Sequence, residues 1–452
     1  MKLANKQVLV FGSGISGLGA SRLLEHNQAD VILYDGNTSL DAEEIRKKIG
    51  AESKTSVLLG ELKDEVIEGL DLCVISPGVP TDLPVVNRIR EKNVPIWSEI
   101  ELAFETGKGD VLAITGTNGK TTTTALLGEI MKAWKGDNVF VVGNIGIPYT
   151  SVAADTKDDS VIVAEISSFQ LETVDTFRPT VSAILNITPD HLDRHHTMEA
   201  YIEAKEAIAK NQQKGETCVL NYEDEVLREF EKKTQASVLY FSSRRRLDTG
   251  VYLEDDRILY AANGETIEVC QTEELQILGV HNYENVMAAV AMAAAYGTPM
   301  HVIREAVKRF GGVEHRIEYV CEKQGVVYYN DSKGTNPDAA IKAIGAMRRP
   351  TYLIGGGYDK NASYKEWIES FDGKVKKLVL IGQTKEKIAQ TAKECGFEDF
   401  EFADSLEEAV ALCAKLAKEG DAVLLSPACA SWGMFQNYEE RGDKFKELVK
   451  SL

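Results

Sequence analysis

The chain has 452 residues, more than one hydrophobic core usually serves, so two or three domains are expected. A net charge of -19 argues against a general nucleic-acid or anionic-membrane surface, because such partners favour broad basic patches. The seven cysteines are scattered without a Cys-x-x-Cys pair, and no apolar run reaches membrane-spanning length. We therefore expect a cytoplasmic protein with reduced thiols and no membrane insertion.

Short β-branched runs alternate with helical patterns along most of the chain, which is typical of parallel α/β domains. Strands are expected at 7–11, 31–35, 71–75, 111–115, 139–142, 161–165, 181–186, 326–330, 351–354, 377–381 and 422–425. The stretch 240–268 has no helical period and predicts a small antiparallel insertion.

We predict an α/β protein of three domains, at residues 1–98, 99–312 and 313–452. The first and third are expected to be Rossmann-like. The second is expected to be a P-loop ATPase-like parallel sheet that carries the antiparallel insertion.

Residues 115–121 read Thr-Gly-Thr-Asn-Gly-Lys-Thr between an apolar strand and a helix. Such a turn aims backbone N–H groups and the positive helix end at phosphate oxygens. Lys120 adds charge for the β- and γ-phosphates, and Thr121 can offer its hydroxyl to Mg²⁺. Ile114 stands where the usual loop has its first glycine. A chance glycine turn is the alternative, but the flanking strand and helix favour ATP binding.

Two side chains follow apolar strands of the same predicted domain. Glu165 can hold Mg²⁺ beside Thr121, although a strand-end glutamate is often only a solvated rim residue. His191 can reach the crevice where open α/β sheets bind ligands, although lone histidines are more often structural. Asn282 and Asn285 are three residues apart, so they can present amides to an adenine edge from one helix face, with helix capping as the alternative.

A second glycine motif, Gly-Ser-Gly-Ile-Ser-Gly at 12–17, follows the first strand, and Asp35 closes the second strand. This matches the dinucleotide fingerprint, so an NAD-dependent oxidoreductase is one interpretation. The geometry requires only a diphosphate at a helix N-terminus, however, and UDP would serve as well as NAD.

Taken together, the motifs resemble those of the Mur ligase family, which also includes folylpolyglutamate synthetases. The matching segments are 115–122, 143–146, 165–171, 186–194, 201–205, 279–285, 315–316 and 331–336. Ile114, in place of the usual first glycine, is then a match to the family and no longer evidence against a phosphate-binding loop. The resemblance implies a ligase that phosphorylates a carboxylate with ATP and then joins it to an amine.

The resemblance also implies a set of site residues. Those for ATP are Gly116, Thr117, Asn118, Gly119, Lys120, Thr121, Thr122, Asn282, Asn285, Arg316 and Asp331. Those for two Mg²⁺ sites are Thr121, Glu165, His191 and Lys205, with Lys205 converted by CO₂ to a carbamate; Lys120, His191 and Lys205 are the implied catalytic residues. Those for a UDP-linked substrate are Ile15, Ser16, Asp35, Ser76, Asn144, Ser167 and Gln170. An ordinary surface lysine is the alternative for Lys205.

The run 425–442 resembles the D-glutamate-adding branch of the family, and no Asp-Asn-Pro-Arg motif of the diaminopimelate-adding branch is present. This implies UDP-N-acetylmuramoyl-L-alanine and D-glutamate as substrates. The implied D-glutamate residues are Lys333, Thr335, Lys360, Ser431 and Tyr438.

Several alternatives stay open. They are another Mur ligase, a folylpolyglutamate synthetase-like ligase, an NAD-dependent oxidoreductase and a non-catalytic nucleotide switch. Lys360 can also be read as an ordinary loop lysine. We expect a bacterial, cytoplasmic monomer.

Overall fold

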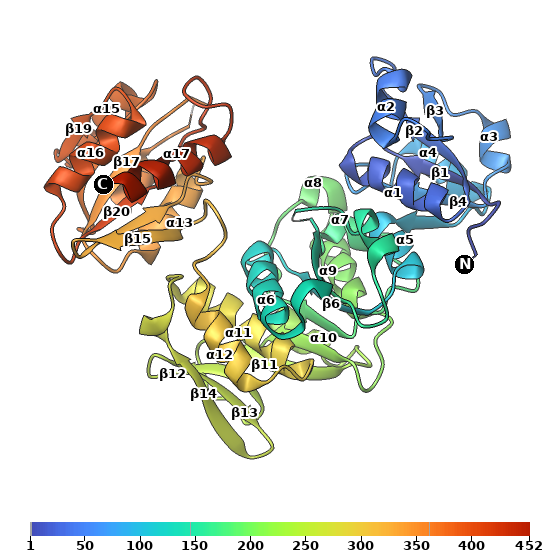
Figure 1. Cartoon of the computed structure of the whole chain (residues 1–452), viewed down its shortest axis with the longest axis horizontal. Helices are drawn as coiled ribbons and strands as arrows, with labels where there is room; N and C mark the ends of the chain where they lie inside the picture. Colours follow the sequence, from blue (N-terminus) through green and yellow to red (C-terminus); the bar gives the residue numbers. More distant parts are fainter. Residues whose placement is uncertain (1, 145, 361) are drawn as a thin grey trace. The chain divides into compact units, whose positions relative to one another are not determined.

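A computed structural model describes residues 2–144, 146–360 and 362–452. It divides into two compact units: Met1–Cys270 with Glu284–Val307, and Gln271–Tyr283 with Lys308–Leu452 (Figure 1). Three sheets lie in these units, so the three-domain α/β class is confirmed, although two of the sheets are mixed rather than parallel. The boundaries at 98/99 and 312/313 stay a prediction.

The N-terminal sheet is parallel and has the order β3-β2-β1-β4-β5. Its strands are β1 (Gln7–Phe11), β2 (Asp30–Asp35), β3 (Ser56–Leu59), β4 (Leu72–Ile75) and β5 (Ile96–Ser98). Its helices are α1 (Ile15–His26), α2 (Ala42–Ile49), α3 (Asp64–Glu68), α4 (Pro84–Glu91) and α5 (Glu99–Thr106). The turn from β1 to α1 needs glycine at Gly17, because a Cβ there would lie 1.8 Å from the Gly12 carbonyl oxygen.

The central sheet has nine strands in the order β14-β13-β12-β11-β10-β9-β6-β8-β7. They are β6 (Asp110–Thr115), β7 (Val139–Gly143), β8 (Val161–Glu165), β9 (Val181–Ile184), β10 (Thr217–Asn221), β11 (Ser237–Ser242), β12 (Gly250–Glu254), β13 (Arg257–Ala262) and β14 (Glu265–Gln271). The α-helices around it are α6 (Lys120–Lys135), α7 (Ser168–Leu171), α8 (Leu192–His195), α9 (Met198–Glu206), α10 (Glu225–Phe230), α11 (Val280–Ala295) and α12 (Met300–Arg309). The 3₁₀ turns among the described residues are η1 (Gly136–Asn138), η2 (Tyr149–Ser151), η3 (Ala153–Asp155), η4 (Ala207–Ala209) and η5 (Thr272–Glu274).

The stretch predicted as an antiparallel insertion proves to be an extension of this main sheet. Strand β11 pairs in parallel with both β10 and β12, and the antiparallel pairing begins only between β12 and β13. A small cluster of Leu247, Tyr252, Leu259 and Ala261 buries one face of the extension.

The C-terminal sheet has the order β15-β16-β20-β17-β18-β19. Its strands are β15 (Glu318–Lys323), β16 (Val326–Asn330), β17 (Thr351–Gly355), β18 (Val375–Leu380), β19 (Phe400–Phe402) and β20 (Ala422–Leu425). Strand β15 runs antiparallel to β16, and the other described pairs of this sheet are parallel. The helices are α13 (Pro337–Ala346), α14 (Lys365–Glu369), α15 (Lys385–Glu394), α16 (Leu406–Leu416) and α17 (Tyr438–Ser451).

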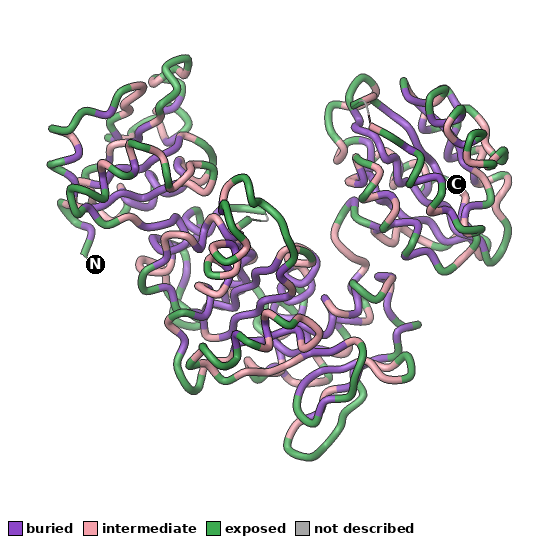
Figure 2. Tube along the Cα trace, turned by 180° about the vertical axis from the view of Figure 1, so that it is seen from behind, coloured by how far each residue is buried: buried purple, intermediate pink, exposed green. Residues whose placement is uncertain are grey.

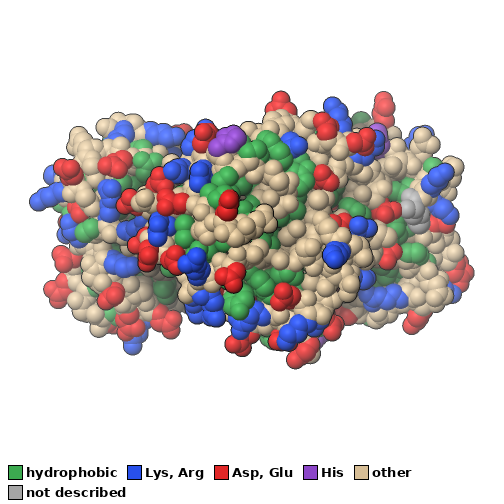
Figure 3. Space-filling model, turned by 90° about the horizontal axis from the view of Figure 1, so that it is seen from below, with side chains coloured by type: hydrophobic (Ala, Val, Ile, Leu, Met, Phe, Trp, Pro, Cys, Tyr) green, Lys and Arg blue, Asp and Glu red, His purple; other side chains and the backbone are tan. Residues whose placement is uncertain are grey.

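Buried residues follow the strands of each sheet, whereas exposed residues gather in the connecting loops (Figure 2). In the first unit one apolar cluster runs from the N-terminal sheet into the central one and includes Trp97, Tyr149 and Phe177. Acidic and basic side chains are interspersed over the face displayed in Figure 3, without a broad basic patch. Among the described residues, no helix has the length and apolar character needed to cross a membrane.

Candidate functional site

The phosphate loop has the predicted strand-turn-helix form. Strand β6 ends at Thr115, Gly116 and Gly119 take positive φ angles of 150° and 87°, and α6 begins at Lys120. No side chain caps the start of α6, so its first N–H groups can receive an anion. Asn118 N donates to Asn186 Oδ1 (2.8 Å), and Asn186 Nδ2 donates to the Asn118 carbonyl (3.1 Å). The loop is therefore held open by a side chain from the neighbouring strand end.

Two lysines converge on one carbonyl of this loop. Lys120 Nζ donates to the Gly116 and Thr117 carbonyls at 2.9 and 3.0 Å, and Lys205 Nζ donates to the Gly116 carbonyl at 2.8 Å. Lys205 comes from α9, and only 2% of its surface is exposed. Burial, and then the charge of Lys120, lower the pKa of Lys205 to about 7. A substantial fraction of this amine is thus neutral near pH 7.

Two oxygens beside the loop are buried without a hydrogen-bond partner among the described residues. They are Glu165 Oε2, at the end of β8, and Thr115 Oγ1, at the end of β6. The other oxygen of Glu165 accepts from Asn144 Nδ2 at 2.9 Å. Strands β6 and β8 are adjacent, so both oxygens lie at the same carboxyl edge as Thr121 in the first turn of α6. A hard cation would satisfy such oxygen ligands.

His191 lies at the edge of this region rather than within it. Its backbone takes a positive φ of 51°, and its half-exposed ring faces Asp190 (Nε2 to Oδ2, 3.5 Å) and Phe169 (centroids 4.9 Å apart). Within the described residues no hydrogen bond joins His191 to Glu165 or Lys205. Of the predicted metal set, Lys205 contacts the loop, Thr121 lies in the first turn of α6, Glu165 ends the strand next to β6, and His191 is half exposed beside Phe169.

Sequence reasoning missed several residues that build this site. Asn186 braces the loop, and Tyr201 OH lies 3.1 Å from Thr117 Oγ1. His195 is buried, lies 2.9 Å (Nε2) from Ser168 Oγ, and has its pKa lowered by burial. Arg194 donates to the carbonyls of Pro77 and Val79, which ties the central sheet to the N-terminal one. Asn186, Arg194 and Tyr201 fall inside segments that resemble the family, and His195 directly follows one of them, but contacts over such long separations leave no local signal.

The predicted UDP residues line one cleft of about 450 Å³ in the first unit. Its lining includes Ile15, Ser16, Asp35, Ser76, Asn144 and Gln170, all six of them predicted. Ser13 N and Oγ both donate to Asp35 Oδ2, at 3.0 and 2.6 Å. Burial by itself would raise the pKa of Asp35. These two hydrogen bonds and a third from Asn37 N outweigh it and lower that pKa. The carboxylate thus braces the glycine turn.

Ser167, the remaining predicted UDP residue, is the N-cap of α7 and hydrogen-bonds to Gln170 Oε1. Gln170 Nε2 in turn donates to Glu99 Oε1 at 2.7 Å. Glu99 is fully buried, and burial raises its pKa to about 7. Sequence patterns did not single out this carboxyl, because it lies at the start of an otherwise ordinary helix.

Of the remaining predicted ATP residues, Thr122 and Asn285 adjoin the phosphate loop, since a Cβ at Gly119 would lie 2.1 Å from Asn285 Oδ1. Asn282 and Asn285 are buried on α11, where Asn282 Nδ2 donates to the Leu278 carbonyl and Thr123 Oγ1 lies 3.5 Å from Asn285 Oδ1. Thr122 is also buried, on α6. Arg316 is exposed between two residues of positive φ.

Asp331 follows β16 and is buried. It accepts from Ser426 Oγ (2.7 Å) and Ile317 N (3.2 Å), but burial raises its pKa to about 7. Its neighbour Ser332 accepts from Arg441 Nε at 2.9 Å, a buried guanidinium that the sequence patterns did not single out.

The predicted D-glutamate residues lie on loops at the carboxyl ends of three neighbouring strands. Lys333 and Thr335 follow β16, Lys360 follows β17, and Ser431 follows β20. The order β16-β20-β17 makes these strands adjacent, so their carboxyl ends share one edge of the sheet. Tyr438 begins α17, and Lys333 Nζ lies 5.6 Å from its ring centroid. The sheet therefore brings this set to one edge.

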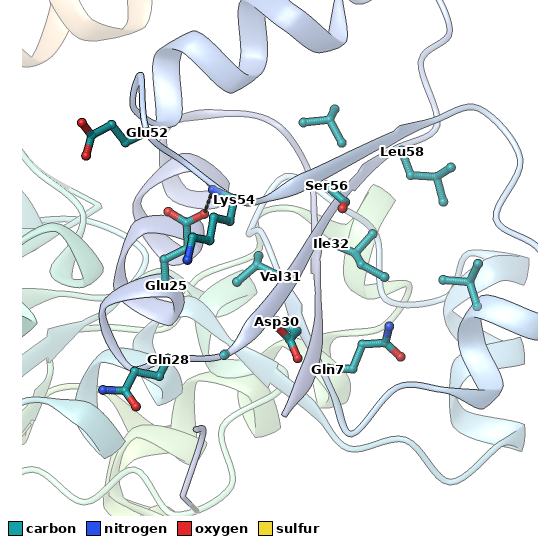
Figure 4. A pocket seen from close by; sticks show the side chains of 13 residues that line it. Gln7, Glu25, Gln28, Asp30, Val31, Ile32, Glu52, Lys54, Ser56 and Leu58 are labelled. Atoms are coloured by element: carbon teal, nitrogen blue, oxygen red, sulfur yellow. Dashed lines mark hydrogen bonds between the residues drawn. The ribbon is translucent and has the colours of Figure 1, made fainter. Parts of the chain in front are cut away.

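A second hollow lies at the opposite ends of the N-terminal strands and holds none of the predicted residues. It has a volume of about 720 Å³ (Figure 4). Gln7, Asp30, Ile32, Ser56 and Leu58 are among its lining residues.

Three family models match the chain. Their descriptions are Mur ligase MurD-like, N-terminal domain (residues 6–98), Mur ligase middle domain (114–293) and Mur ligase, glutamate ligase domain (315–429). The UDP-N-acetylmuramoylalanine–D-glutamate ligase of Lachnoclostridium phytofermentans is 58% identical over 100% of this chain and 99% of its own length. That of Lachnospira eligens is 55% identical over the full length of both chains.

Solved structures share the fold at low sequence identity. The chain superposes on a UDP-N-acetylmuramate-alanine ligase from Thermotoga maritima with a TM-score of 0.57, at 20% identity and 99% coverage of both chains. A MurF ligase from the same organism, solved in complex with ADP, gives a TM-score of 0.54 at 16% identity, covering 100% of this chain and 97% of that one.

Proposed function

The chain belongs to the Mur ligase family, and on this premise we propose that it joins D-glutamate to UDP-N-acetylmuramoyl-L-alanine with conversion of ATP to ADP and phosphate. The full-length identity to ligases named for this reaction carries the proposal. An NAD-dependent oxidoreductase is not supported, because the relatives that match the whole chain are ligases. The cytoplasmic location and the monomeric state stay predictions.

ATP is assigned to the phosphate loop, where the start of α6 and Lys120 would face the β- and γ-phosphates. Mg²⁺ is assigned to the unpartnered buried oxygen of Glu165, together with the Thr121 hydroxyl. The ion would neutralise phosphate charge during phosphoryl transfer.

We assign Lys205 as a lysine that CO₂ converts to a carbamate. Its neutral amine can attack CO₂, which forms an N–C bond and releases one proton, and the lowered pKa makes that neutral form available near pH 7. A carbamate replaces a buried positive charge beside Lys120 with a negative one that can hold a second Mg²⁺, with His191 as the other predicted ligand.

The nucleotide-linked substrate is assigned to the cleft lined by Ile15, Asp35 and Ser76, with its diphosphate at the start of α1. Its alanyl carboxylate would attack the γ-phosphorus, giving an acyl phosphate and ADP. The D-glutamate amine would then attack the acyl carbon, and phosphate would leave. Lys333, Thr335, Lys360, Ser431 and Tyr438 are assigned to D-glutamate.

The test is phosphate release from ATP, Mg²⁺ and UDP-N-acetylmuramoyl-L-alanine with D-glutamate as the added amine. L-glutamate, L-alanine and diaminopimelate serve as comparison amines. We expect release only with D-glutamate, and almost none from a Lys120→Ala variant. Equal release with another amine would overturn the substrate assignment, and normal turnover by Lys120→Ala would overturn the ligase proposal.

A further inference from the structure

Two large aromatic side chains lie exposed at the sheet edge assigned to D-glutamate. Trp432 is 53% exposed and Tyr358 is 40% exposed, and their ring centroids lie 5.5 Å apart at an interplanar angle of 61°. Lys360 Nζ lies 4.8 Å from the centroid of the Trp432 ring. We call Tyr358, Lys360 and Trp432 the aromatic corner.

The backbone under the aromatic corner is tightly constrained. Gly356 N donates to the Pro427 carbonyl at 2.8 Å, and Tyr358 N donates to the Ala430 carbonyl at 2.9 Å. Gly357 has a φ of 155°, and a Cβ there would lie 2.4 Å from the Ala430 carbonyl oxygen. These contacts join the loop after β17 to the loop after β20. The exposed rings therefore stand on a fixed platform.

The indole face is the partner that locates the Lys360 ammonium. The neighbouring Asp359 pairs with Lys387 at 3.1 Å, whereas within the described residues no ion pair joins Lys360 to a carboxylate. A cation within about 6 Å of a tryptophan ring is attracted by the negative face of the ring. Unlike a carboxylate, the ring does not neutralise the ammonium charge. Lys360 thus remains available to an incoming anion.

We propose that Trp432 is a positioning residue for D-glutamate, which holds the Lys360 ammonium over its indole face where that ammonium receives a substrate carboxylate. This inference rests on the proposed function. D-glutamate carries two carboxylates and a short aliphatic chain, so it suits a corner that offers a cation beside an apolar surface. Tyr358 supports the indole edge-on and limits its rotation.

The test asks whether Trp432 acts on D-glutamate through Lys360, by contacting D-glutamate itself, or only by supporting the fold. Trp432→Leu is expected to raise the KM for D-glutamate about 2- to 5-fold, the range that an exposed cation–π contact supports, with kcat and the KM for ATP unchanged. Trp432→Phe keeps an aromatic face and should restore much of that loss. Lys360→Ala should raise the KM for D-glutamate by about 10-fold or more, since it removes a charged hydrogen bond.

A double-variant cycle gives the decisive comparison. If Trp432 acts through Lys360, then adding Trp432→Leu to Lys360→Ala should leave the KM for D-glutamate unchanged. Trp134 provides a matched control, because Lys135 Nζ lies 4.2 Å from its ring and Tyr296 packs against it at 5.9 Å, at the opposite end of α6 from Lys120. Trp134→Leu should leave every KM unchanged.

Tryptophan fluorescence gives an independent readout. D-glutamate should change the emission of the wild-type protein in the presence of ATP and UDP-N-acetylmuramoyl-L-alanine, but not that of a Trp432→Phe, Trp134→Leu double variant, whose remaining Trp97 and Trp367 are buried. An unchanged KM in Trp432→Leu, or additive effects in the double variant, would overturn the inference alone. A wild-type protein without D-glutamate-dependent phosphate release would overturn the proposed function and this inference with it.

Discussion

Replacing Lys205 with methionine is expected to stabilise the protein while removing its activity. Burial and the charge of Lys120 lower the pKa of this lysine from the ordinary 10.5 to about 7, so at neutral pH the folded state must bury a charge or release a proton. By linkage, this difference in pKa between the unfolded and folded states lowers the free energy of unfolding of the wild-type protein by about 4 to 5 kcal/mol. The variant also loses the hydrogen bond to the Gly116 carbonyl, which destabilises it by about 1 to 2 kcal/mol. The net expected gain for Lys205→Met is about 3 kcal/mol.

The pH dependence has a definite sign. Below pH 7 Lys205 is protonated in the folded and unfolded states alike, so the advantage of the variant is constant and largest there. Between about pH 7 and 10.5 the unfolded wild-type chain binds a proton that its folded state has released. Wild-type stability therefore rises with pH relative to the variant, and the gap should close towards pH 10.

Urea unfolding at pH 6.5, 8 and 9.5 would measure this gap, in buffer that contains a chelator and is depleted of CO₂ so that the lysine is unmodified. Turnover with all three substrates is measured separately, with Mg²⁺ and CO₂ present, and should fall more than about 100-fold in Lys205→Met, because the variant cannot form the carbamate assigned to hold the second Mg²⁺. Lys210→Met, at an exposed position nearby in the chain, is the control. The reasoning would be refuted if Lys205→Met were less stable than wild type at pH 6.5. It would also be refuted if the difference in unfolding free energy between the two proteins did not change with pH.

Three further outcomes are expected. Glu165→Gln should raise the Mg²⁺ concentration needed for half-maximal phosphate release by about 10-fold or more, because it removes a charged ligand; unchanged Mg²⁺ dependence would contradict that assignment. Gly17→Ala should destabilise the chain by about 1 to 3 kcal/mol and weaken UDP-substrate binding in calorimetry, since its Cβ would meet the Gly12 carbonyl. Burial raises the pKa of Asp331 to about 7, so the folded state holds an extra proton between pH 4 and 7 and wild-type stability should fall across that range; Asp331→Asn should flatten the fall in a denaturation series.

The features that the sequence predicted well are local in the chain. The phosphate loop follows from a strand, two glycines and a helix within about a dozen residues, and the structure has this form from β6 to α6. The glycine turn after β1 is equally local, and Asp35 was found because it ends the next strand. Both loops could therefore be predicted to bind phosphate groups from the sequence alone.

The features that the sequence left out depend on long separations. Asn186 braces the loop from 68 residues away, and Lys205 reaches the Gly116 carbonyl from 89 residues away. The parallel pairing of β11 with β10 is likewise set by the sheet, so the stretch 240–268, predicted as antiparallel, is antiparallel only from the β12–β13 pair onward. The roles of the individual site residues remain proposals, since neither similarity nor geometry tests them.

The shared carbonyl at Gly116 links the proposed modification of Lys205 to nucleotide binding. Lys120 and Lys205 both donate to this oxygen, so two ammonium groups compete for one acceptor inside a largely buried site. A carbamate on Lys205 would end that competition, because the carbamate nitrogen carries no positive charge and its oxygens attract Lys120. Lys120 would then be held between a carbamate and the nucleotide phosphates instead of against the loop. On this reasoning, CO₂ depletion should weaken ATP-dependent turnover in the wild-type protein most strongly at low pH, where the protonated amine predominates.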